Sequence, residues 1–158
     1  MEDKDRVAIR QARREDAPCL HALHTAAVRS LSAPHYPPEV IERWLKNRNP
    51  QGYLPSIERG AMFVAESDAG VIGFGEAVKG AVIAVFVDPA AVGRGVGRAI
   101  LEYALEIARR DHEGPVRVES TLNASAFYEK HGFHEIKRTV LRRNDVDVPI
   151  VIMEMPAP

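Results

Sequence analysis

Three glycines at alternate positions stand between an apolar segment and an amphipathic one in the middle of the chain. The apolar segment Val85-Phe86-Val87-Asp88-Pro89 leads through two alanines into Val92-Gly93-Arg94-Gly95-Val96-Gly97-Arg98. Glycines remove Cβ atoms where a ligand would approach the backbone, and the free N–H groups of a helix start carry the positive end of its dipole. Such a loop can cradle a pyrophosphate. A flexible helix start without a ligand is the alternative that the glycines alone leave open.

The spacing excludes two common phosphate-binding loops. A Walker loop needs Gly-Lys followed by Ser or Thr, and this segment contains no Lys, Ser or Thr. A Rossmann fingerprint has glycines two and then three positions apart, whereas these lie two and two apart behind a run of predicted hairpins.

A second group of residues follows at Asn123-Ala124-Ser125-Ala126-Phe127-Tyr128-Glu129-Lys130-His131-Gly132-Phe133. Asn123 is expected to cap a short helix that carries Tyr128, and Gly132 stands where a left-handed residue would end that helix. The hydroxyl of Tyr128 is a possible proton donor, although a half-buried tyrosine can also simply bond solvent or a carbonyl group.

Together the two segments resemble the acetyl-CoA motifs of the GNAT superfamily. Gly95 and Gly97 occupy the glycine positions of the first motif, and the Asn, Tyr and Gly-Phe of the second occur in the family's order. Val92 replaces the Gln or Arg that usually opens the first motif, so it would contribute only its backbone and an apolar contact. The resemblance extends from Val7 onward and implies an acetyl-CoA-dependent N-acetyltransferase.

The resemblance also implies where the cofactor lies. Its arm would run along the strand of Val85 to Val87 as an added strand, and a main-chain N–H near Phe86 would polarise the thioester carbonyl. The residues expected to bind acetyl-CoA are Val85, Phe86, Val87, Val92, Gly93, Arg94, Gly95, Val96, Gly97, Arg98, Asn123, Phe127 and Tyr128.

Acetyl transfer to an amine needs a proton donor for the departing thiolate and a route for the amine proton. Tyr128 matches the family's general acid. Many relatives carry an acidic residue on the fourth strand, where this chain has Ala81 and Ile83. Glu76 and Glu119 are the remaining candidates for the base, and a chain of water molecules is the alternative.

The acceptor is expected to be a primary amine of a small molecule or peptide. His35, Tyr36 and Glu76 are the predicted substrate-binding residues, because the family's acceptor pocket lies next to the second helix. Tyr36 could instead pack on the core. A non-catalytic domain that binds or senses acetyl-CoA is the competing function, favoured by the missing acid on the fourth strand.

Hydrophobic periodicity predicts the elements that position these residues. The order is a strand at 6–10, a helix behind Asp16, a helix from Pro37-Pro38, strands at 62–66, 71–78 and 81–87, a helix, a parallel strand at 116–120, the short helix, and a hairpin that turns at Asn144-Asp145. This order resembles that of the GNAT family, so the resemblance implies an α/β (α+β) GNAT fold: a central mixed, mostly antiparallel twisted sheet of about six to seven strands flanked by four helices.

Composition limits the remaining possibilities. The 158 residues predict one domain, and 21 basic against 22 acidic side chains give no field to attract nucleic acid, such as aminoacyl-tRNA, or a membrane. The only cysteine, Cys19, cannot form an internal disulfide, which is typical of the cytoplasm. His21 and His24 lack the further ligands that a metal site requires. A homodimer through the C-terminal hairpin is possible.

Overall fold

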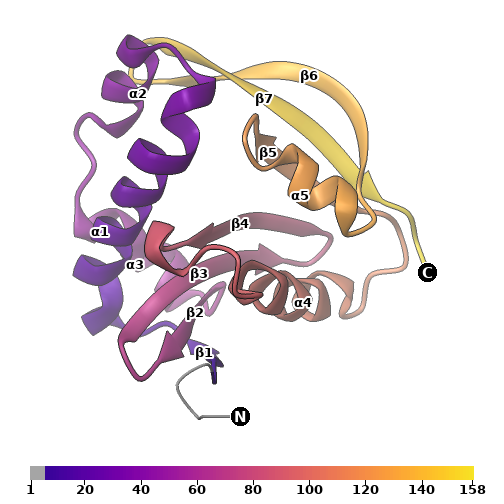
Figure 1. The fold of residues 1–158 in the computed structure, drawn as a ribbon. Coiled ribbons are helices and arrows are strands. Elements are labelled where there is room, and N and C mark those ends of the chain that lie inside the picture. Colours follow the sequence, from indigo (N-terminus) through magenta and orange to yellow (C-terminus); the bar gives the residue numbers. More distant parts are fainter. Residues whose placement is uncertain (1–5) are drawn as a thin grey trace.

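One seven-stranded sheet organises the molecule in the computed structural model, which describes residues 6–158 (Figure 1). Helices α1 and α3 pack with one face of the sheet, and α4 and α5 with the other. The strands are β1 (Ala8–Gln11), β2 (Met62–Ser67), β3 (Gly70–Val78), β4 (Ala81–Val87), β5 (Val116–Thr121), β6 (His134–Arg143) and β7 (Val146–Met155). The α-helices are α1 (Ala17–Ala27), α2 (Pro38–Leu45), α3 (Leu54–Glu58), α4 (Val96–Arg109) and α5 (Ser125–Lys130).

The strands lie in the order β1-β2-β3-β4-β5-β7-β6, and every pair is antiparallel except β4 and β5. The parallel pair arises because α4 carries the chain back across the sheet, as the sequence predicted. The β6–β7 hairpin turns at Asn144 and Asp145, whose positive φ angles of 47° and 64° suit these residue types. The mixed, mostly antiparallel GNAT sheet is therefore confirmed.

Both faces of the sheet are buried, which explains why the central strands are apolar without strict alternation. On β2, Met62 and Val64 belong to the core cluster beneath α1 and α3, while Phe63 and Ala65 belong to the cluster beneath α4. Glycine on β3 lets α4 approach closely: a Cβ at Gly75 would lie 2.7 Å from Cγ2 of Ile100 on α4, and one at Gly73 would lie 2.7 Å from its Cδ1.

Strands β4 and β5 separate soon after they meet. Their pairing is limited to Ala81 with Arg117 and Val82 with Val118. A bulge follows at once, because Ala77 faces Val82 while Glu76 faces Ala84, which leaves Ile83 as an extra residue on β4. β5 pairs with β7 along its whole length instead. From Ala84 to Val87, one edge of β4 therefore has no strand partner within residues 6–158.

Three local predictions differ from the structure. There are five α-helices rather than four, because the Asn49-Pro50 break is followed by a 3-10 turn (Pro50–Tyr53) and then α3. Asn123 does not cap α5: the N–H of Ala124 bonds the carbonyl of Thr121, so a turn intervenes and the helix begins at Ser125. Asp16 holds the N-cap position of α1, but its carboxylate bonds Arg10 and the Arg13 N–H rather than the helix.

Candidate functional site

Two cavities meet where β4 and β5 separate. The larger, of about 760 Å³, lies between β4, the start of α4, and α5. The smaller, of about 260 Å³, lies between the sheet and the chain from α1 to α3. Both are lined by the same short set of residues at the separation: Ile83, Ala84, Phe86, Glu119 and Thr121. A molecule in one cavity can therefore contact a molecule in the other.

The glycine loop forms one end of the larger cavity. Gly93 and Gly95 have φ angles of +87° and +78°, and a Cβ added to either would meet nothing within 4 Å. Gly95 is also the N-cap of α4, which has no capping side chain. The N–H groups of the first helical turn thus remain available to an anion, in a backbone conformation that favours glycine.

The start of α4 and the whole of α5 pack directly on each other. A Cβ at Gly97 would lie 3.3 Å from Phe127 Cε1, so a larger residue would push α5 away. Tyr128 is 3% exposed and packs edge-on against Phe127 and Phe133. Burial raises the pKa of its hydroxyl, which therefore keeps its proton at neutral pH.

Asn123 supplies a polar atom without a partner. The residue lines the larger cavity, and its buried side-chain Oδ1 accepts no hydrogen bond in the part of the chain that the structure describes. A buried acceptor of this kind is costly unless a ligand satisfies it. Together with the free edge of β4 and the start of α4, it fits a ligand that carries a pyrophosphate and an amide-bearing arm. All the predicted cofactor residues except Arg94 line this cavity.

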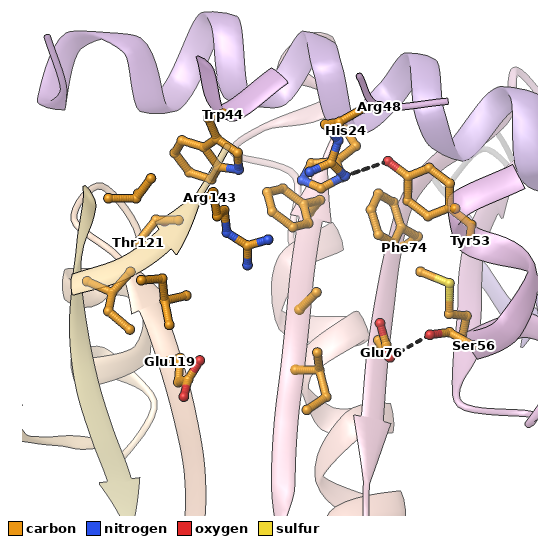
Figure 2. A pocket seen from close by; sticks show the side chains of 18 residues that line it. His24, Trp44, Arg48, Tyr53, Ser56, Phe74, Glu76, Glu119, Thr121 and Arg143 are labelled. Carbon is orange, nitrogen blue, oxygen red and sulfur yellow. Dashed lines mark hydrogen bonds between the residues drawn. The ribbon is translucent and has the colours of Figure 1, made fainter. Parts of the chain in front are cut away.

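The two candidate bases reach the smaller cavity from different strands (Figure 2). Glu76 on β3 is 15% exposed, accepts a hydrogen bond from Ser56 Oγ at 2.9 Å and lies 3.9 Å from Arg59 Nη2. Glu119 on β5 is 45% exposed and has Arg117 Nη2 at 3.8 Å. Glu119 alone of the two lines both cavities.

A histidine cluster that the sequence did not predict closes the far end of the smaller cavity. The Tyr53 hydroxyl shares a hydrogen bond of 2.8 Å with His24 Nδ1 and accepts one from Arg48 Nη2 at 2.9 Å. Arg48 Nη2 also contacts His24 Nδ1 directly. Desolvation, and then the charges of Arg48, Arg143 and His21, hold the pKa of His24 well below its usual value. His24 is therefore neutral and serves this cluster rather than a metal.

Arg143, at the end of β6, extends its guanidinium into the smaller cavity (Figure 2). Much of the side chain contacts solvent, but desolvation and the nearby Arg48 lower the pKa of the guanidinium, while Glu119 opposes this shift. Its neighbour Arg142 is exposed and pairs with Asp147 at 2.9 Å. Successive side chains of a strand point to opposite faces, so these two arginines lie on different faces of β6. This alternation was the only sign in the sequence that one of them faces inward.

The predicted acceptor residues before α2 are placed differently. His35 lines the larger cavity rather than the smaller one. Tyr36 lines neither, because its hydroxyl donates to the Pro149 carbonyl at 2.7 Å and accepts the Leu122 N–H at 2.9 Å. Its ring packs edge-on against Trp44 with centroids 5.4 Å apart. Tyr36 thus has the packing role that was its alternative.

Two further kinds of site were sought across residues 6–158. No group of three or more His, Cys, Asp or Glu side chains there is arranged to hold a metal ion. None of the helices in that range combines the length and the apolar character that crossing a bilayer requires.

Comparison with known proteins agrees with this architecture. By sequence, the chain is 26% identical to the N-acetyltransferase YafP of Escherichia coli (strain K12) over 132 residues. The aligned segment covers 84% of each chain. By structure, it resembles the GCN5-related N-acetyltransferase from Rhodopseudomonas palustris, with a TM-score of 0.80, 22% identity and 94% of each chain covered. The PaiA N-acetyltransferase from Thermoplasma acidophilum, solved in complex with coenzyme A, has a TM-score of 0.73 at 22% identity, over 96% of this chain and 99% of that one.

The family comparison covers most of the chain. The model of the acetyltransferase (GNAT) domain matches residues 32–155, which include both cavities' strands, the glycine loop and the Asn123–Phe133 segment. Since this match spans well over half of the sequence, and the fold and the two motifs agree with it, the chain belongs to the GNAT acetyltransferase family and is an N-acetyltransferase.

Proposed function

We propose that this chain transfers the acetyl group of acetyl-CoA to a primary amine by direct attack at the junction of the two cavities. The observation that carries the proposal is the set of residues that borders both cavities: Ile83, Ala84 and Phe86 on β4, and Glu119 and Thr121 on β5. A cofactor in the larger cavity and an amine in the smaller one would meet there without a covalent enzyme intermediate.

The larger cavity would hold the cofactor through the backbone. N–H groups at the start of α4 bind the pyrophosphate, the free edge of β4 binds the arm, and Asn123 Oδ1 accepts an N–H from that arm. Acetyl-CoA supplies a thioester whose acyl group is open to attack. Support comes from the PaiA relative, solved with coenzyme A, and from a Salmonella typhimurium acetyltransferase solved with acetyl-CoA.

Different residues at the junction would carry out the two proton transfers, one from the amine and one to the sulfur. A main-chain N–H near Phe86 stabilises charge on the carbonyl oxygen, and Glu119 takes the amine proton directly or through water. As the C–N bond forms, the C–S bond breaks, its electron pair goes to sulfur, and Tyr128 donates its proton there. Burial disfavours both a phenolate and a thiolate at this place, so the raised pKa of Tyr128 is compatible with the donation.

The test is a thiol-release assay with acetyl-CoA and a panel of amines, amino acids and peptides. Tyr128→Phe is expected to lower kcat about 100-fold while coenzyme A binding is unchanged, because only the proton is removed. Tyr103→Phe is the matched control, since Tyr103 is a half-buried tyrosine of α4 that lines neither cavity. Turnover of Tyr128→Phe at the wild-type rate would exclude the acid role.

A further inference from the structure

The smaller cavity contains two guanidinium groups without a carboxylate partner. Arg48 bonds only His24 and Tyr53, both neutral, and its buried Nε has no hydrogen-bond partner. Arg143 makes neither an ion pair nor a side-chain hydrogen bond with any residue from 6 to 158. Much of Arg143 contacts solvent, but the buried Nε of Arg48 lacks a partner, and two guanidinium groups that repel each other in one cavity favour the binding of an anion.

Neither acidic residue of the same cavity forms an ion pair with Arg48 or Arg143 within residues 6–158, although the charge of Glu119 acts on Arg143. Glu76 is held by Ser56 and lies beside Arg59, on the far side of the cavity from Arg143 in Figure 2. Glu119 has its shortest ion-pair contact with Arg117, at 3.8 Å, and none with Arg143. The cavity therefore has two cationic groups near His24, and Glu119 lies close to Arg143 at the junction with the larger cavity.

The remaining lining restricts the size and polarity of the occupant. A volume of about 260 Å³ lies just below the usual range of roughly 300–1,000 Å³ for ligand pockets, which favours a small molecule over a peptide. The remaining walls, which would receive the side chain of an occupant, are mostly apolar: Trp44, Phe74, Phe86, Leu141, Val148 and Ile150.

From these features we infer that the acceptor is a free amino acid with an apolar side chain, whose carboxylate binds Arg48 and Arg143 while its amine faces Glu119. The inference rests on the proposed transfer reaction and names its substrate class. A guanidinium pairs with a carboxylate through two parallel hydrogen bonds, which also fixes the direction of the amine. A polyamine would add positive charge next to two arginines, and a phosphorylated amine would add a second negative charge beside Glu76 and Glu119.

The decisive comparison uses three acceptors that share one side chain: L-leucine, L-leucinamide and isopentylamine. The amine of leucinamide is less basic than that of leucine, so more of it is unprotonated at neutral pH, and chemistry alone favours the amide. We expect leucine to be preferred over both by at least about tenfold in kcat/KM, because only leucine offers the carboxylate. Equal or better use of isopentylamine would overturn the inference and leave the transferase intact.

Substitution of Arg143 provides the second arm. Arg143→Gln is expected to raise KM for leucine about 10- to 100-fold and to change KM for isopentylamine much less, and Arg143→Lys should recover part of the loss. Arg142→Gln is the matched control, because Arg142 is the adjacent exposed arginine that pairs with Asp147. An unchanged KM for leucine in Arg143→Gln would contradict the assignment.

Binding separates this inference from the reaction on which it rests. Calorimetry on the protein saturated with coenzyme A would measure the affinity for the twenty common amino acids. Binding of apolar amino acids to the wild type but not to Arg143→Gln, without turnover, would support the carboxylate site and reject the transfer proposal. Failure of every amino acid to bind would reject the carboxylate site.

Discussion

Glu119 and Glu76 are the two candidate bases, and their different positions in the cavities predict different roles. Both line the smaller cavity, but Glu119 also borders the larger one, while Glu76 is fixed by the hydroxyl of Ser56. A base must reach the amine at the moment of attack. Position at the junction therefore favours Glu119 for proton removal and Glu76 for shaping the acceptor side.

Glu119→Gln is accordingly expected to lower kcat/KM about 100-fold at pH 7. The loss should shrink as the pH rises above the pKa of the acceptor amine. More of the amine is then already neutral, so less of it needs a base to remove the proton of the ammonium form. Glu76→Gln should act mainly on KM, and the exposed Glu113→Gln serves as control. The measurement is a pH profile of kcat/KM for the three variants; a loss in Glu119→Gln that does not vary with pH would argue against the base role.

The sequence predicted only part of this site, and the division follows distance along the chain. The glycine loop and the segment around Tyr128 are short motifs, so their residue types could be assigned before any fold was known. His24, Arg48 and Arg143 come from α1, the chain after α2, and β6. Packing alone brings these three together, and no local pattern marks them.

At the scale of elements, Tyr36 fastens the segment before α2 to the far half of the sheet. Its hydroxyl links the carbonyl of Pro149 on β7 to the N–H of Leu122 after β5. Tyr36→Phe should lower the free energy of unfolding by about 1–3 kcal/mol, because a partly buried donor and acceptor both lose their partner. Urea unfolding measures the change, with Tyr103→Phe as the control. A loss no larger than that of the control would mean that water replaces the hydroxyl.

The elements themselves were largely predictable, because apolar periodicity changes from two to 3.6 at each boundary. The exceptions arise where several turns adjoin. Pro50 and Pro55 each occupy the first turn of a short helical segment, so the predicted end of one helix is the start of others. Asn123 was expected to cap α5. The extra turn at Ala124 instead leaves its side-chain oxygen without a partner within residues 6–158, at a position next to the larger cavity.

At the scale of the whole molecule, Arg10 on the edge strand β1 links that strand to β2 and to the turn before α1. It donates to both oxygens of Asp16, at 2.9 and 3.1 Å, and to Glu66 of β2 at 3.0 Å. The hydrogen bonds from Arg10 lower the pKa of Asp16 more than burial raises it. The carboxylate form is thus favoured by folding, and this stability is present above the ordinary pKa and lost as the pH falls through the lowered one.

Asp16→Asn should therefore reduce the free energy of unfolding at pH 7 by about 1 kcal/mol. The difference from wild type should shrink as the pH falls below the ordinary value of 3.8 and disappear below the lowered pKa. Urea midpoints at pH 7, 5 and 3 would follow it, with the exposed neighbour Glu15→Gln as control. A difference that persists unchanged at pH 3 would show that the ion pair with Arg10 is not its source.

The wedge-shaped gap that opens between β4 and β5 beyond Val82 also limits the length of the donor that can fill it. Its apex is fixed by the bulge at Ile83, and its wide end by the helix start at Gly95. Ala84 to Val87 alone extend roughly 10 Å at about 3.3 Å per residue. A donor must span this length to place a phosphate at one end and an acyl carbon at the other. An acetyl carrier with a shorter arm can occupy the helix start or the apex, but not both, so the fold selects its donor by length as well as by chemical groups.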